Sequence, residues 1–205
     1  YDYDLLEEKY LENQGRNVDD TESVKKLKHE LEGKEILLIA PGKSVESQSD
    51  AVQAYIKTHH PVIIDVNAVT DLYPVDYLFL INKVRYDYAK NAYAKIFADT
   101  DKILLSSVKT ESSGNENIIN FSSVVKTGLL HFDNAVIYCL RLLDKLGVKK
   151  VAIAGFDKFE EKYNESYVDE SLPAVSLKEN YQKLNEELSE MLDDFLKTNH
   201  SGMEV

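Results

Sequence analysis

The stretch GKEILLIAPGKS, residues 33–44, passes from charged residues into an unbroken apolar run and ends in a Pro-Gly-Lys-Ser turn. Such an apolar run is typical of a strand that is buried on both faces of a parallel sheet. A turn with glycine and serine that opens onto a helix is where α/β proteins bind phosphate, because the free N–H groups of a helix N-terminus attract anions. A tight strand-to-helix turn without a ligand would have the same pattern, so both interpretations stay open.

The turn matches neither of the two common phosphate-binding fingerprints. The sequence contains no GxGxxG, and GxxxxGK[ST] requires a glycine five positions before Gly42, where the chain has Leu37. The phosphate hypothesis therefore depends on the position of the turn, between a buried strand and a helix.

Composition limits the classes of fold and partner. The chain has 205 residues, 43% of them hydrophobic, which suffices for one α/β domain with a sizeable core. Its formal net charge of -12 argues against nucleic acid or an anionic membrane as the main partner, since both require a basic surface. The one cysteine, Cys139, lies in the apolar run AVIYCLRLL and is expected to be a buried hydrophobe. Since no stretch has the length of a membrane span and the N-terminus does not resemble a leader, we expect a cytoplasmic protein.

Residues 1–32 are highly charged and carry apolar residues at helical spacing, first in YDYDLLEEKYLENQ and again around Val24, Leu27 and Leu31. Asp20-Thr-Glu-Ser is a suitable cap for the second of these helices. We interpret the segment as a helical connector from an upstream domain, followed by the main domain at residues 33–205.

After the connector, short β-branched runs alternate with longer amphipathic segments, as in βαβ units. We expect strands at residues 35–40, 62–66, 77–81, 102–106, 117–121 and 150–154. The best helix patterns cover residues 44–58, 85–98, 131–146 and 176–197. This alternation predicts an α/β fold with a mostly parallel, doubly wound sheet.

Polar residues follow the expected strands, at the edge where ligands bind in such sheets. Amide, hydroxyl and backbone groups there suit ribose, base and phosphate, but the same residue types also form turns and helix caps, and both interpretations stay open. The candidates are Pro41, Gly42, Lys43 and Ser44 after the first strand, Asn67 after the second, Asn82, Lys83 and Arg85 after the third, Thr127 and Gly128 before the long helix, and Asp157 after the last strand.

Four segments in this order, LLIAPGKS, IIDVNAV, DYLFLINKVRY and TGLLHFDNAVIYCLRLLDKLGVKKVAIAGFD, resemble the sialyltransferase-like Rossmann fold. Bacterial CMP-sialic-acid-dependent transferases and archaeal 6-hydroxymethylpterin diphosphokinases share that fold, and the likeness covers residues 36–157. The chain is more similar still, over nearly its whole length, to the C-terminal domain that follows an aldolase-type TIM barrel in bacterial proteins labelled 4-hydroxy-2-oxovalerate aldolase. The segments YDYDLLEEKYLENQ, APGKS, NKVRY and AGFD, taken as a set, carry this resemblance.

The resemblance implies a Rossmann-like nucleotide-binding domain at residues 33–205 and an aldolase-type barrel upstream in the same polypeptide. Its implied ligand is a cytidine or other nucleotide, with or without Mg²⁺. The implied contacts are Gly42 and Ser44 to phosphate, Asn67 and Asn82 to sugar or pyrimidine, and Thr127 and Gly128 along the same cleft, which Asp157 closes; in a transferase, Lys43 or Arg85 would stabilise phosphate charge.

The chain departs from the transferases at two positions. Those enzymes have tyrosines shortly after the Gly-x-Asp and a catalytic histidine ahead of the last helix, whereas this chain has Phe159 and Val175, and only Tyr163 could replace a tyrosine. A diphosphokinase needs carboxylates for magnesium, and besides Asp157 the rim offers Asp65, which we expect inside its strand. One open function is a nucleotide or nucleotide-sugar binding module of an aldolase-type lyase without its own turnover. The other is a nucleotide-sugar-dependent transferase or diphosphokinase.

The histidines support no metal site in the sequence. His59 and His60 are adjacent and point apart on a connecting loop, so we interpret them as surface residues. His131 begins an expected helix, where it is either a proton shuttle or a polar residue near the cap, and both interpretations stay open.

Overall fold

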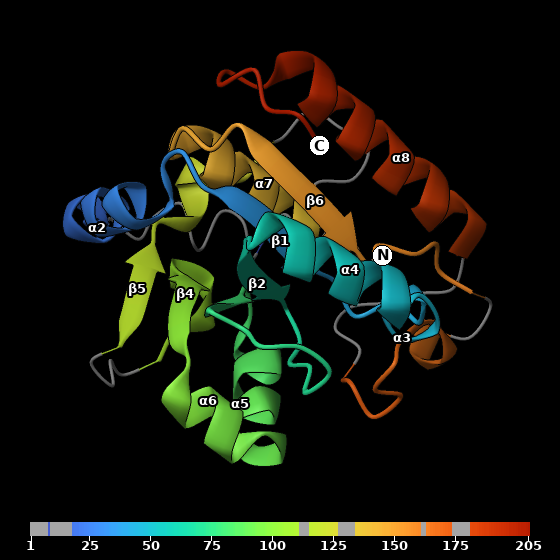
Figure 1. Cartoon of the computed structure of the whole chain (residues 1–205). Coiled ribbons are helices and arrows are strands. Elements are labelled where there is room, and N and C mark those ends of the chain that lie inside the picture. Colours follow the sequence, from blue (N-terminus) through green and yellow to red (C-terminus); the bar gives the residue numbers. More distant parts are fainter. Residues whose placement is uncertain (1–7, 9–17, 111–114, 127–133, 161–162, 174–180) are drawn as a thin grey trace.

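The computed structural model describes residues 8, 18–110, 115–126, 134–160, 163–173 and 181–205. Its centre is a sheet of six strands in the order β5-β4-β3-β2-β1-β6, and every neighbouring pair is parallel (Figure 1). The strands are β1 (Glu35–Ile39), β2 (Val62–Val66), β3 (Tyr77–Leu80), β4 (Asp101–Leu105), β5 (Glu116–Ile119) and β6 (Lys150–Ala154). The doubly wound, Rossmann-like α/β fold is thereby confirmed.

Helices cover both faces of the sheet, as the apolar clusters show. On one face, α2 (Thr21–Leu31), α7 (Ala135–Lys145) and α8 (Tyr181–Thr198) pack on the largest cluster. On the other face, α4 (Ser49–His59) packs beside β1 and β2, and α5 (Lys83–Ala92) and α6 (Ala94–Asp99) pack beside β3 and β4. Short turns complete the described elements: α3 (Ser44–Ser47), η1 (Ser106–Val108), η2 (Phe121–Ser123) and η3 (Tyr163–Ser166).

Two of the expected helices are each divided in the structure. The segment 44–58 forms α3 and α4 with Gln48 between them, and the segment 85–98 forms α5 and α6 with Tyr93 between them. Tyr93 leaves helical geometry at φ -124° and ψ 43°, and its hydroxyl donates to Asp169 at 2.9 Å. The break thus coincides with a tertiary contact, which the local sequence pattern does not indicate.

Two other helix predictions are described only in part. The long helix is described from Ala135, after Asn134, whose side chain accepts from the backbone N–H of Ile137 at 3.1 Å. Residues 131–133 and 176–180 of the expected helices lie outside the described residues. Within the described part of the chain, no helix combines the length and the apolar character that a membrane span requires.

The second helix of the expected connector packs into the core of the sheet. Leu27 and Leu31 of α2 are fully buried in the main cluster. Just before α2, the Asp20 carboxylate accepts from the backbone N–H of Asn120 at 3.0 Å. The domain division at residue 32 stays a prediction, but α2 on its N-terminal side contributes to the same core.

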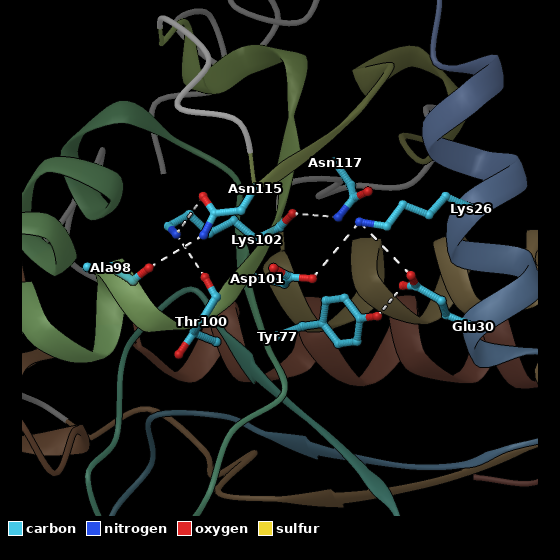
Figure 2. A network of polar contacts seen from close by, with 9 residues as sticks. All are labelled: Lys26, Glu30, Tyr77, Ala98, Thr100, Asp101, Lys102, Asn115 and Asn117. Atoms are coloured by element: carbon cyan, nitrogen blue, oxygen red, sulfur yellow. Dashed lines mark hydrogen bonds and ion pairs between the residues drawn. The ribbon is translucent and has the colours of Figure 1, made fainter.

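A polar network ties α2 to the amino ends of β3 and β4, at the edge opposite to the predicted site (Figure 2). Lys26 lies 4.0 Å from the carboxylates of both Glu30 and Asp101, and the Tyr77 hydroxyl donates to Glu30. Lys102 beside them is 1% exposed, donates to the carbonyl of Thr100 at 2.8 Å, and lies 4.4 Å from a phenylalanine ring centroid. We interpret this network as structural because it is far along the strands from their carboxyl ends.

Candidate functional site at the carboxyl edge of the sheet

The strand order reverses beside β1, which lies between β2 and β6 although β6 is the last strand of the chain. The backbone continues the pairing past both strands, since Ala40 donates to the carbonyl of Ala154 at 2.8 Å and Gly42 to that of Gly155 at 2.9 Å. Gly155 has a φ of 75°, and a Cβ there would lie 2.2 Å from the carbonyl oxygen of Ala40. A side chain is therefore excluded where the two strands end, and in doubly wound sheets this reversal is the usual place for a ligand.

The Pro41 to Ser44 turn holds a carboxylate of the chain itself. Asp157 accepts from the Ser44 backbone N–H at 2.8 Å and from the Ser44 hydroxyl. It thus occupies the position where the sequence predicts a phosphate. A Cβ on Gly42 would lie 2.4 Å from the Gly155 carbonyl oxygen and 2.6 Å from an Asp157 oxygen, so Gly42 is required by packing as well.

Both predicted lysines are exposed and form surface ion pairs. Lys43 lies 3.0 Å from Glu170, and Lys83 lies 2.5 Å from Asp87 on the next turn of α5. Exposed pairs of this kind contribute about 0 to 1 kcal/mol, so either ammonium group is able to leave its partner for a ligand phosphate.

The predicted asparagines lie at the same edge, at the ends of β2 and β3, and Arg85 contacts both. Asn82 caps α5 by accepting from the backbone N–H of Arg85 at 2.9 Å, and the Arg85 guanidinium donates to the Asn67 carbonyl at 3.3 Å. Arg85 is 4% exposed and stacks over the ring of Tyr167 at 5.4 Å. The sequence thus correctly brings these residues together, but in this structure their contacts are largely with one another.

The segment from Tyr167 to Leu172 crosses over the carboxyl ends of the strands. Tyr167 pairs with Gly42 as an antiparallel bridge, and Val168 donates to the carbonyl of Pro41 at 3.0 Å. Asp169 then accepts from the hydroxyls of Tyr88 at 2.7 Å and Tyr93. This crossing segment therefore covers the Pro41 to Ser44 turn.

For four residues that the sequence singles out, the structure describes no side-chain contacts. Thr127 and Gly128 lie outside the described residues, as does His131. The backbone of Tyr163 begins η3, but its side chain is not described.

A pocket of about 180 Å³ lies under the crossing segment, beyond the ends of β1 and β2, and we call it the Asp65 pocket. Among the predicted site residues that the structure describes, Pro41 alone lines it. Its walls are apolar, from Ile39, Val45, Val69 and Leu172 among others, and its polar members are Glu46, Asp65, Thr70, Asp71, Tyr93 and Asp169.

Asp65 is the most unusual group of the pocket. It is 1% exposed, and one of its oxygens accepts from the Thr70 backbone N–H at 2.7 Å. The other oxygen, Oδ1, is buried without a hydrogen-bond partner among the described residues. Burial raises the pKa of Asp65 well above its ordinary value, and the bond from Thr70 opposes this only in part.

The sequence correctly predicts Asp65 inside its strand but predicts no role for it. A signal was present, since a single carboxylate interrupts the apolar run of β2, and buried charged groups are costly unless they have a partner. What the sequence could not show is the crossing segment, about 100 residues later, which closes the space around that carboxylate.

No model of a known protein family matches the chain, and a search of curated proteins finds no similar one. The similarity to aldolase-associated and sialyltransferase-like domains therefore stays a hypothesis that depends on the segments quoted above.

Proposed function

We propose that the domain binds a nucleotide or a nucleotide-sugar at the carboxyl edge of its sheet, as a module of an aldolase-type lyase and without turnover of its own. The observation that carries the proposal is the gathering of polar segments where the strand order reverses. Ser44 and Asp157 meet there, Arg85 links Asn67 to Asn82, and Lys43 stands exposed at the rim. Such a rim offers donors and acceptors to sugar and base, and the exposed ammonium group of Lys43 to phosphate.

The attachment to an aldolase-type barrel is supported by the resemblance of the N-terminal segment and of APGKS, NKVRY and AGFD. A transferase or diphosphokinase remains the alternative. The position of Asp157 bears on both, because a phosphate can reach the Ser44 N–H only if the Asp157 carboxylate moves aside or shares that donor.

The test is calorimetric titration of the protein with CMP, CDP and ATP. We expect saturable heats for at least one of them and a several-fold weaker affinity for Lys43→Gln, because the variant loses the exposed cation of the turn. Lys90→Gln, which removes an exposed lysine on α5, is the control of equal charge change.

The substitution Gly42→Val is not a suitable probe, since its Cβ would collide with the Gly155 carbonyl and disturb the fold. Absence of heat for all three nucleotides, or equal affinities for the two lysine variants, would remove the turn as a nucleotide site.

A further inference from the structure

Apolar side chains form most of the lining of the Asp65 pocket. Val45, Val69 and Leu172 among them are nearly fully buried, so they belong to the packed interior of the domain. In such surroundings a polar atom loses its hydration, whereas an apolar atom gains by leaving water. Nine of the fifteen lining residues are apolar and Tyr93 adds an aromatic ring; the nine are Ile39, Ala40, Pro41, Val45, Ala68, Val69, Leu72, Val168 and Leu172.

The carboxylates of the lining do not alter this apolar character. Glu46 and Asp71 are exposed residues, so their charges keep their hydration. Asp169 already accepts from two tyrosine hydroxyls and from a backbone N–H. Asp65 accepts from a backbone N–H with one oxygen, and its other oxygen is buried away from solvent. The surface that remains for a ligand inside the pocket is therefore apolar.

Two exposed apolar side chains stand where the pocket meets solvent. Leu72, in the loop after β2, is 38% exposed, and Val168, in the crossing segment, is 37% exposed, and both line the pocket. Apolar surface thus continues from the interior of the pocket to the surface of the protein. A ligand that enters the pocket and covers these side chains would remove further apolar area from water.

The size of the pocket and its charged surroundings favour a small molecule as the occupant. Apolar cavities of about 150 Å³ hold a molecule the size of benzene, and this pocket has a volume of about 180 Å³. The centres of protein interfaces are depleted of charged residues, whereas here the exposed Glu46 and Asp71 belong to the lining itself.

We propose that the Asp65 pocket binds an uncharged apolar group of about six to seven non-hydrogen atoms, an alkyl chain or ring carried by a small molecule. Val45, Val69 and Leu172 surround this group, and Leu72 and Val168 contact it at the mouth of the pocket. The site differs from the proposed nucleotide site, and the inference does not depend on it.

The experiment compares 1-hexanol with 1-butanol in NMR titrations of the whole chain without nucleotide. We expect 1-hexanol to bind about tenfold more tightly, because each additional CH₂ group that leaves water strengthens binding up to about fourfold. The methyl resonances of Val45, Val69 and Leu172 should report the binding, since these side chains line the pocket.

Two pairs of variants locate the bound alcohol. Leu72→Ala removes apolar surface at the mouth and should weaken the binding of 1-hexanol several-fold, whereas Leu196→Ala, the same change at an exposed position on α8, should not. Ala68→Leu adds three carbon atoms to the lining and should weaken binding at least about fivefold, because it fills part of the pocket. Ala54→Leu, at an exposed position on α4, is its control.

Four results would overturn the proposal: no saturable binding of 1-hexanol, equal affinities for the two alcohols, shifts confined to residues outside the lining, or variants of Leu72 and Ala68 that bind as their controls do. Should Ala68→Leu fail to fold, Leu72→Ala decides together with the two alcohols, because truncation of an exposed side chain leaves the core intact.

Discussion

The carboxylate of Asp157, two residues after the Gly155 at the end of β6, accepts from both the backbone N–H and the hydroxyl of Ser44 at the start of α3. This pair joins the two strands that flank the reversal of strand order, 113 residues apart in the chain. The pair holds the Pro41 to Ser44 turn in place, and it also puts a negative charge where the sequence predicts a phosphate.

The first prediction concerns the stability that this pair provides. Asp157→Ala leaves the Ser44 N–H and hydroxyl without their acceptor and should lower the free energy of unfolding by about 1 to 2 kcal/mol. Urea denaturation followed by circular dichroism measures the loss. The exposed Asp193→Ala is the control and should change stability by less than about 0.5 kcal/mol. Equal losses for both would mean that the Asp157 contact has no stabilising role.

Substitutions at two glycines distinguish the cost of backbone strain from the cost of close packing. Gly155 and Gly33 both have a φ of 75°, but a Cβ on Gly155 would lie 2.2 Å from the Ala40 carbonyl oxygen, whereas a Cβ on Gly33 meets nothing within 4 Å. Gly33→Ala should therefore cost about 1 kcal/mol through strain alone. Gly155→Ala should cost at least about 1 to 3 kcal/mol more, because the ends of β1 and β6 must move apart. Thermal denaturation of both variants tests this, and equal melting temperatures would refute the close approach.

The architecture could be predicted from the sequence because its signals are local. The apolar run 35–40 and its later counterparts specify buried strands, and the amphipathic segments between them specify crossover helices, which together require a parallel sheet. The convergence of Asn67 and Asn82 follows from that topology. The break near Tyr93 and the pocket could not be predicted, because Asp169 contacts Tyr93 from 76 residues away. No local pattern in either segment indicates that contact.

The raised pKa of Asp65 predicts a specific pH dependence of stability. Well below pH 3.9, the ordinary pKa of an aspartate, the carboxyl group is protonated in both states and contributes nothing. Between its unfolded pKa near 3.9 and its higher folded pKa, the unfolded chain ionises first, so the wild type loses stability as pH rises. Asp65→Asn lacks this loss and should be more stable than the wild type by about 1 kcal/mol or more at pH 7, with little difference at pH 3.5. Urea denaturation at the two pH values measures the difference in unfolding free energy between the two proteins. An equal difference at both pH values would contradict the burial of Asp65.

The contribution of Lys102 to stability should change in the opposite direction, increasing as the pH rises in the alkaline range. Burial lowers its pKa, so the folded protein releases this proton at a lower pH than the unfolded chain does. Between these two pKa values the unfolded state binds more protons, and stability rises with pH. Relative to Lys102→Met, the wild type should therefore gain on the order of 1 kcal/mol between pH 8 and pH 10.5. Lys90→Met, at an exposed position, should show no such trend. If the difference in unfolding free energy between the wild type and Lys102→Met does not change with pH, the ammonium group of Lys102 is well hydrated.

The last prediction is that the chain does not transfer sialic acid from CMP-sialic acid at an appreciable rate. General-base catalysis contributes about 10² to 10⁴-fold, and under the proposed resemblance Val175 takes the position of the transferases' histidine. Phe159, at the position of their first tyrosine, has no hydroxyl for the departing phosphate, and its ring packs against Tyr167 with centroids 6.3 Å apart. The Ser44 N–H that would contact the phosphate is already bonded to Asp157.

The protein is incubated with CMP-sialic acid and lactose, with and without Mg²⁺, and CMP release is followed against a protein-free control. We expect release at the control rate, together with calorimetric binding of CMP. A rate well above the control that falls in Lys43→Gln, but not in Lys90→Gln, would show that the rim supplies the chemistry by other groups. The binding-module proposal would then be replaced by the transferase alternative.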